Sequence, residues 1–191
     1  VYTHYSRILI SMKQNYAIRM LDQWDLTGRY VYLKRDLRKM FRDEPKETFD
    51  DSLTRLVKAG LLVRAARGVY VYRLTRNFGD ATLDLIARNL RRGHVTYESL
   101  ESMLSSYGVI SQIPVDRRTY MTTGRSGEYH TPYGAIEFTH TSKSIASIAP
   151  ELLHPESRGV PLATKHLALR DLKATRRNLD LVDYSQLDDE A

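Results

Sequence analysis

The sequence predicts an α+β protein with two domains, residues 1–78 and 79–191. Apolar residues recur at helical spacing in the first part and are followed by two short β-prone runs. After residue 110 the spacing changes to the alternation typical of strands. The two parts also differ in charge. Residues 1–73 hold 15 Lys and Arg against 8 Asp and Glu, a net charge of +7, whereas residues 74–191 hold 14 against 15.

The first domain opens with two predicted helices separated by a short strand. Apolar and aromatic residues recur at helical spacing in residues 14–25, and Gly28 is a typical residue at a helix end. Residues 30–32 are β-prone and predict a brief strand. Residues 33–41 carry apolar side chains at i, i+4, i+7 and i+8, which predicts the second helix, and Pro45 prevents that helix from continuing.

A third helix and a hairpin complete the first domain. The helix is expected to begin at about Thr48, because Thr48 and Asp51 form a capping-box pattern, and to end at the next glycine. Two strands, 61–64 and 69–73, follow on either side of Gly68, which tolerates the positive φ angle of a tight hairpin. Helix, turn, helix and hairpin is the order of a winged helix-turn-helix.

We therefore expect the first domain to be a winged helix-turn-helix that binds double-stranded DNA, since its basic excess suits a polyanion. On the polar side of the third helix, Arg55 suits a guanine edge and Asp51 suits a cytosine amine. Lys58 and the hairpin residue Arg67 suit phosphates or a narrow minor groove. For each residue the alternative is an ordinary solvated side chain, and Asp50 and Asp51 are unfavourable near DNA. The predicted DNA-binding residues are Lys34, Arg38, Thr48, Asp51, Ser52 (at the margin of the face), Thr54, Arg55, Lys58, Arg64 and Arg67.

The second domain is predicted to combine helices with a small antiparallel sheet. Helical spacing predicts helices over residues 80–92 and 96–107, with Thr96 as the cap of the second. Alternating β-prone residues predict strands over 118–122 and 135–140. The remaining predicted segments are a loop at 141–160, a helix at 162–176 and a frayed acidic tail at 188–190.

Composition narrows the class of protein. The chain has 191 residues with 42% hydrophobic and 27% charged residues, which argues against disorder. No apolar run reaches the ~20 residues that span a bilayer. There is no cysteine, so disulfides and thiolate metal sites are excluded and a cytoplasmic location is expected. The opening residues do not read as a secretory signal, and Met12 is an alternative start, so whether residues 1–11 are native stays open.

Motifs for catalysis or cofactor binding are missing from the sequence. It lacks the phosphate-loop, dinucleotide-binding, zinc-protease and nucleophile-elbow patterns, and no two of its six histidines share a helix turn. Glu128 and His130 would share a face in an extended strand. We expect no enzyme activity, no cofactor and no metal; the alternative is a nuclease that uses C-terminal acids and histidines. Residues 124–127 suit either a hairpin turn or an anion-binding nest.

Four segments, in one order, carry a resemblance to a known family. They are LVKAGLLVRAARGVYVY (56–72), HVTYESLESMLSSYGVI (94–110), TYMTTGRSGEYHTPYGAIEFTH (119–140) and ATKHLALRDL (163–172). Together they resemble the AbiEi-type antitoxins, over residues 30 to 176. The pattern Y-x-S-L-x-S-x-L-x-x-Y-G followed by two strands is the most distinctive part.

The resemblance implies the antitoxin of a type IV toxin–antitoxin, or abortive-infection, system. In that family a winged helix represses its own operon by binding inverted repeats in the promoter. The C-terminal domain is associated with neutralising a nucleotidyltransferase-like toxin encoded next door, without a stable complex. On this chain the resemblance implies DNA contacts from Thr54, Arg55, Lys58 and Arg67, and an antitoxicity domain over 94–172.

The last segment departs from the family pattern, which tends to have Glu then Lys where this chain has His166 and Leu167. Leu167 and Ala168 are then expected to be packing residues and Asp171 a surface charge. The alternative function is a stand-alone winged-helix transcription regulator whose C-terminal domain senses a ligand or partner. The operator sequence, the oligomeric state and the mechanism of neutralisation do not follow from the sequence.

Overall fold

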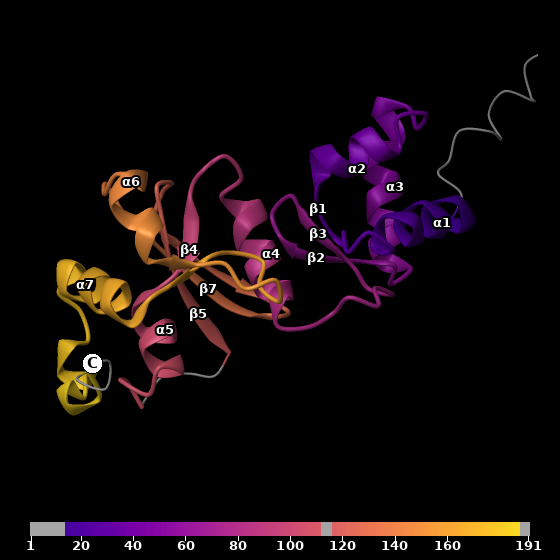
Figure 1. Cartoon of the computed structure of the whole chain (residues 1–191). Coiled ribbons are helices and arrows are strands. Elements are labelled where there is room, and N and C mark those ends of the chain that lie inside the picture. Colours follow the sequence, from indigo (N-terminus) through magenta and orange to yellow (C-terminus); the bar gives the residue numbers. More distant parts are fainter. Residues whose placement is uncertain (1–13, 112–115, 188–191) are drawn as a thin grey trace, which may run out of the picture. The chain divides into compact units, whose positions relative to one another are not determined.

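The computed structural model describes residues 14–111 and 116–187 (Figure 1). The chain divides into two compact units, Val1–Gly79 and Asp80–Ala191. Each unit mixes helices with a β-sheet of its own, so the predicted α+β class is confirmed. The predicted acidic tail and the open question about residues 1–11 lie outside the described residues.

The N-terminal unit packs its helices against a three-stranded antiparallel sheet. Its elements are α1 (Gln14–Asp25), β1 (Val31–Leu33), α2 (Lys34–Met40), α3 (Lys46–Lys58), β2 (Leu62–Ala66) and β3 (Val69–Tyr72). The strand order is β1–β3–β2, so β3 pairs with both of the other strands. The predicted helices and strands of this part of the chain are confirmed, with ends that differ by a few residues.

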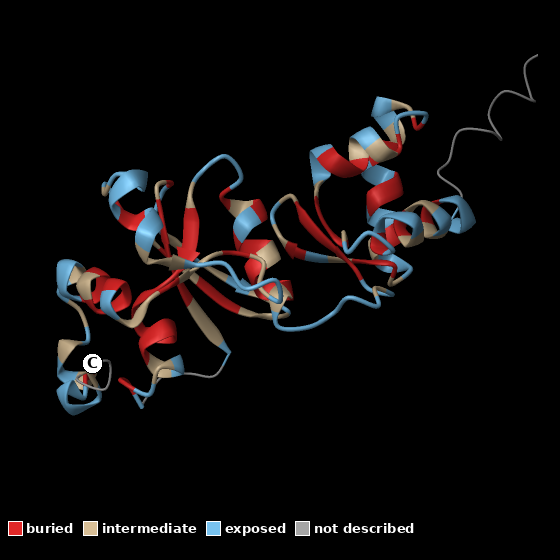
Figure 2. Ribbon diagram, in the orientation of Figure 1, coloured by how far each residue is buried: buried red, intermediate tan, exposed pale blue. Residues whose placement is uncertain are grey.

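The core of this unit follows from the apolar spacing of its helices. Each helix has a buried side, which Figure 2 shows in red, and an exposed polar side. Because apolar residues three or four positions apart share one side of a helix, these stripes face the sheet together. The buried helical residues include Leu21, Leu37, Phe49, Leu53 and Leu56, and the sheet adds Val69, Val71 and Tyr72.

The start of α3 corrects the predicted capping box. The helix begins at Lys46, with Pro45 at the cap position and no side chain bonded there. The Thr48 hydroxyl instead donates to the carboxylate of Glu44 at 3.0 Å. A proline has a φ angle suited to a helix start, and Pro45 has φ −58°, so the backbone itself sets the first turn.

Gly68 makes the turn of the β2–β3 hairpin. Its φ angle is +78°, which confirms the positive value that the sequence predicted. An L-residue with a side chain adopts this region only at a cost, so glycine is the natural residue here. The register of the hairpin shifts between Arg64 and Ala66, and such a bulge increases the local twist of the strands.

Asp25 ties the end of α1 to the segment that follows the sheet. Its buried carboxylate accepts hydrogen bonds from the Thr75 hydroxyl, from the Arg76 backbone at 3.1 Å and from the Asn77 side chain at 2.9 Å. Burial acts to raise the pKa of Asp25, but these donors outweigh it and hold the pKa below its ordinary value.

The C-terminal unit is organised around a six-stranded mixed sheet with the order β6–β7–β5–β4–β9–β8. Its strands are β4 (Thr96–Glu98), β5 (Arg117–Thr122), β6 (Gly127–Thr131), β7 (Gly134–His140), β8 (Leu152–Leu153) and β9 (Leu162–Ala163). Its helices are α4 (Ala81–Leu90), α5 (Leu100–Ser106), α6 (Ile145–Ile148) and α7 (Lys165–Thr175), and its short 3-10 turns are Ala149–Glu151, Leu179–Leu181 and Tyr184–Leu187.

Four predictions for the secondary structure of this unit were wrong. The segment predicted as a loop, 141–160, contains α6 and β8. The sheet is not antiparallel throughout, because β5 and β7 run parallel, as do β4 and β9. The stretch predicted as a connection between two strands contains a strand of its own, β6, which pairs with β7. Thr96 lies in β4 and does not cap a helix; Ser99 occupies the cap position of α5. Residues 96–98 form a strand despite their helical spacing, because β4 pairs with β5.

Helices cover both faces of this sheet. Tyr97 and Met121 point to one face, where they share a core with α5 and α7. Tyr120, the neighbour of Met121, points to the other face, where its hydroxyl donates to Asp84 on α4 at 2.8 Å. Side chains alternate along a strand, so neighbouring residues of β5 serve the two layers in turn.

A charged cluster is buried between α4 and the sheet. The side chain of Asp84 is 0% exposed and accepts from Arg158 Nε at 2.7 Å, Arg118 Nη1 at 2.9 Å and the Gly159 backbone at 3.2 Å. Arg158 also pairs with Glu98 on β4. Burial acts to raise the pKa of Asp84, but the two guanidinium groups hold it below its ordinary value.

Candidate nucleic-acid interface

The outer side of α3 presents polar side chains to solvent. Asp51, Thr54, Arg55 and Lys58 are exposed, while the opposite side of the helix is buried. The Thr54 hydroxyl donates to the backbone carbonyl of Asp50 at 2.9 Å. Apart from Lys46 at its start, the helix carries acids in its first half and the bases Arg55 and Lys58 in its last turn, so positive charge is concentrated at its C-terminal end.

Three of the predicted DNA-binding residues donate hydrogen bonds to Glu44. Ser52 is 1% exposed, and its hydroxyl donates to the buried Glu44 carboxylate. Thr48 donates to the same carboxylate, and Arg38 donates to the Glu44 and Phe41 carbonyls. Ser52 therefore does not belong to the exposed face as predicted. A buried acid at position 44 was not expected. Its carboxylate accounts for Thr48 and Ser52, whereas Arg38 is held by backbone carbonyls.

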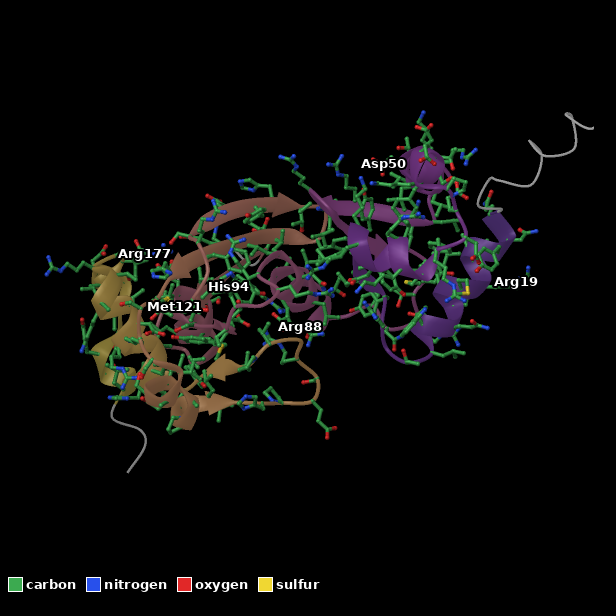
Figure 3. The ribbon with its side chains drawn as sticks, turned by 90° about the horizontal axis from the view of Figure 1, so that it is seen from above. Arg19, Asp50, Arg88, His94, Met121 and Arg177 are labelled. Carbon is green, nitrogen blue, oxygen red and sulfur yellow. The ribbon has the colours of Figure 1, made fainter. Side chains whose placement is uncertain are left out.

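Arg38 and Lys34, on α2, differ in their surroundings. The Arg38 guanidinium lies 5.2 Å from the centroid of the Phe49 ring and is partly buried. Lys34 is exposed and pairs with Asp50 at 2.7 Å, across from α2 to α3 (Asp50 is labelled in Figure 3). This pair neutralises one of the acids that the sequence showed as unfavourable near DNA. An exposed pair of this kind contributes about 0–1 kcal/mol to stability.

The hairpin adds cations next to α3. Arg64 on β2 and Arg67 at the turn are both exposed, and α3 packs against β2. Arg55 lies on the same helix, and its Nη2 donates to the Ser52 hydroxyl at 2.7 Å. The structure thus gathers the bases of the second half of α3 and those of the hairpin within one unit.

In the C-terminal unit, Asp171 was predicted to be a surface charge, and this was wrong. Its side chain is 0% exposed and accepts from Lys143 Nζ at 2.5 Å, from the Ser99 hydroxyl at 2.8 Å and from the Tyr97 hydroxyl at 3.0 Å. Leu167 and Ala168 are buried in the core, so the prediction that they pack is confirmed. Tyr97 in β4 and Ser99 at the cap of α5 were the signal that could have indicated partners for this acid.

In the part of the chain that the structure describes, no helix is long and apolar enough to cross a membrane. Within the same residues, no group of three or more His, Asp or Glu side chains is arranged to hold a metal ion. Glu128 and His130 do lie together, 3.4 Å apart, on β6.

Comparison with known proteins adds a likeness of fold. No protein-family model matches the chain, and no curated protein matches it. The crystal structure of the RV2827C protein from Mycobacterium tuberculosis is similar, with a TM-score of 0.51 and 16% sequence identity. The match covers 81% of this chain and 59% of that one, so this chain spans about three fifths of the length of its neighbour. The matched 81% of this chain is longer than either unit, so the likeness of fold includes residues of both units.

Proposed function

We propose that the N-terminal unit is a winged helix-turn-helix that binds double-stranded DNA, with α3 in the major groove and the β2–β3 hairpin as the wing. The observation that carries the proposal is the polar outer side of α3, ending in Arg55 and Lys58, beside a hairpin that exposes Arg64 and Arg67. The order of elements and the strand order β1–β3–β2 support it.

The side chains divide by the contacts that they suit. Thr54 and Arg55 lie on the outer side of α3, where base edges would be read, and a bidentate arginine contact to guanine is the commonest specific one. Lys58, Arg64 and Arg67 suit phosphates, which orient a protein on DNA without reading sequence. Since Lys34 already neutralises Asp50, the acids of α3 that would face DNA are Glu47 and Asp51.

The test is binding to the DNA upstream of the gene, measured by fluorescence anisotropy against a scrambled duplex over a range of salt. Arg55→Ala is expected to cost about 1–3 kcal/mol and to relax base preference. Arg67→Ala is expected to weaken binding to both duplexes and to lower the log–log salt slope by ~0.9. Arg19→Ala is the matched control, because Arg19 is exposed on α1 (Figure 3). Equal binding to both duplexes by the unmodified protein would refute sequence-specific binding.

We propose further that the protein is an autorepressor and the antitoxin of a type IV toxin–antitoxin pair. The support is the resemblance of its C-terminal segments to AbiEi-type antitoxins. The segments 94–110, 119–140 and 163–172 belong to β4 with α5, to β5 through β7, and to β9 with α7. Apolar residues of all three segments share one core, so they belong to one folded unit. We propose that this unit supplies the antitoxicity, against a nucleotidyltransferase-like toxin and without a stable complex.

Co-expression with the neighbouring gene tests this second part. The full chain is expected to restore growth when that gene encodes a nucleotidyltransferase-like toxin. A variant with both Arg55→Ala and Arg67→Ala is expected to lose repression yet still restore growth, because both changes lie in the N-terminal unit. If the full chain represses but does not restore growth, the alternative is favoured, namely a stand-alone regulator whose C-terminal unit senses a ligand or partner.

A further inference from the structure

A pocket of about 860 Å³ opens in the C-terminal unit at the end of α4. Three arginines line it, Arg91, Arg92 and Arg125, together with His94 and His140. None of the ten described residues that line the pocket is an acid. Guanidinium groups gathered in this way repel one another, and an anion bound among them removes that cost.

Arg91 is a buried arginine in the wall of this pocket. The residue is only 8% exposed, and an arginine guanidinium carries a positive charge in proteins. Its guanidinium lies 4.1 Å from the centroid of the Phe138 ring and 5.2 Å from that of Tyr129. Nε donates to the Arg125 carbonyl at 2.9 Å, and Nη1 donates to the Tyr129 hydroxyl at 3.1 Å. These contacts hold the planar group in one orientation without neutralising its charge.

The loop between β5 and β6 is held equally firmly around the pocket. His140 donates from its backbone to the Ser126 hydroxyl at 2.8 Å, and its Nδ1 lies 2.8 Å from the Gly124 carbonyl. Since a carbonyl oxygen only accepts, Nδ1 carries the proton. At Gly124 an added Cβ would come within 3.0 Å of the Arg91 side chain and 3.2 Å of the His94 ring (labelled in Figure 3). The loop therefore approaches the Arg91 and His94 side chains closely, and a residue larger than glycine at position 124 would push against both.

We infer that this pocket binds a small organic phosphate. A phosphate carries up to two negative charges and several acceptor oxygens, which the forked donors of arginine match better than any other side chain. The hydroxyl of Ser126 and the rings of His94 and Tyr129 line the remaining space. The volume is much larger than a phosphate ion, so the ligand includes an organic part that lies against these rings. The inference concerns the C-terminal unit alone and does not depend on the proposed DNA binding.

Isothermal titration calorimetry on the full chain tests the inference with phenyl phosphate and with inorganic pyrophosphate. Saturable binding of phenyl phosphate is expected. Arg125→Ala is expected to lower the affinity for phenyl phosphate at least tenfold. Arg91→Lys keeps the charge but loses the planar fork, and a similar loss is expected; its thermal unfolding is compared with that of the unmodified protein to verify folding. Arg88→Ala is the matched control, since Arg88 is exposed on α4 and does not line the pocket (Figure 3). Its affinity is expected to be unchanged.

Three outcomes would overturn the inference. The first is no saturable heat with phenyl phosphate or with pyrophosphate at millimolar concentration. The second is equal binding of malonate, which would assign the pocket to carboxylates. The third is displacement of phenyl phosphate by duplex DNA that Arg125→Ala abolishes, which would assign the pocket to a nucleic-acid backbone. Loss of DNA binding by Arg55→Ala with phenyl phosphate binding retained would support two independent sites.

Discussion

Replacing Arg158 with methionine tests whether the buried charged cluster holds the C-terminal unit together. Arg158 donates from Nε to Asp84 at 2.7 Å and from Nη2 at 3.1 Å, and it also pairs with Glu98. The variant removes all three bonds and keeps most of the side-chain volume. Asp84 then retains Arg118 Nη1 at 2.9 Å and the Tyr120 hydroxyl at 2.8 Å.

The magnitude follows from what remains around Asp84. Removing one partner from a buried ion pair typically costs about 3–5 kcal/mol, because the other charge stays buried. Arg118 still balances Asp84, but Glu98 is also buried and loses its ion pair with Arg158, so a loss of at least about 3 kcal/mol is expected. At about 4 °C per kcal/mol for a unit of this size, the unfolding temperature is expected to fall by about 12 °C.

Differential scanning calorimetry of the full chain measures this loss. Trp24, the sole tryptophan, lies in the other unit, and its fluorescence follows that unit separately. Arg88→Met is the matched control, exposed on the same helix as Asp84, with an expected change below about 0.5 kcal/mol. A loss below about 1 kcal/mol for Arg158→Met would refute the reasoning.

The same cluster predicts a dependence on pH. The pKa of Asp84 in the folded protein lies below its ordinary value, so the ionised carboxylate stabilises the fold above the unfolded pKa of about 3.9. That stabilisation is lost as the pH falls below about 4 and through the folded pKa. In Asp84→Asn this part of the acid sensitivity is expected to disappear. An unchanged pH profile between pH 5 and 2 would contradict the account.

Asp25→Asn is expected to lower the stability of the N-terminal unit by about 1.5–3 kcal/mol in urea unfolding followed by Trp24 fluorescence, because it weakens charge-assisted bonds to a buried carboxylate. The difference in stability between this variant and the unmodified protein should shrink below about pH 4, because the lowered pKa of Asp25 stabilises the fold only where the acid is ionised. A constant difference in stability down to pH 2 would contradict this account. Gly134→Ala puts a Cβ 2.5 Å from a backbone carbonyl oxygen and is expected to cost more than about 3 kcal/mol in thermal unfolding. Gly93→Ala, also at positive φ but with open space, should cost about 1–2 kcal/mol, and equal losses would argue against the close contact. Asp171→Ala is expected to cost about 3–5 kcal/mol by calorimetry, whereas a surface charge would cost almost nothing.

Much of the N-terminal unit could be predicted because its signals act over a few residues. Apolar spacing set the buried sides of α1, α2 and α3, and Gly68 at φ +78° set the hairpin turn. The burial of Glu44 could not be predicted from such local signals. A lone acid in a turn reads as a solvated charge, yet it is 6% exposed and accepts from Thr48 and Ser52. Its position depends on how α3 packs, which local spacing does not encode.

The sequence by itself determined the α+β class, the uneven charge and the helical and turn segments, because these follow from composition and from contacts between near neighbours. Only the tertiary structure decided which strands pair and which charges are buried. Asp171 meets Ser99 and Tyr97 across 72 and 74 positions of chain, and Arg158 meets Asp84 across 74. The parallel pairing of β5 with β7 is equally non-local, as is the basic pocket at the end of α4. Such contacts depend on the packed fold as a whole, because no stretch of a few residues contains both partners.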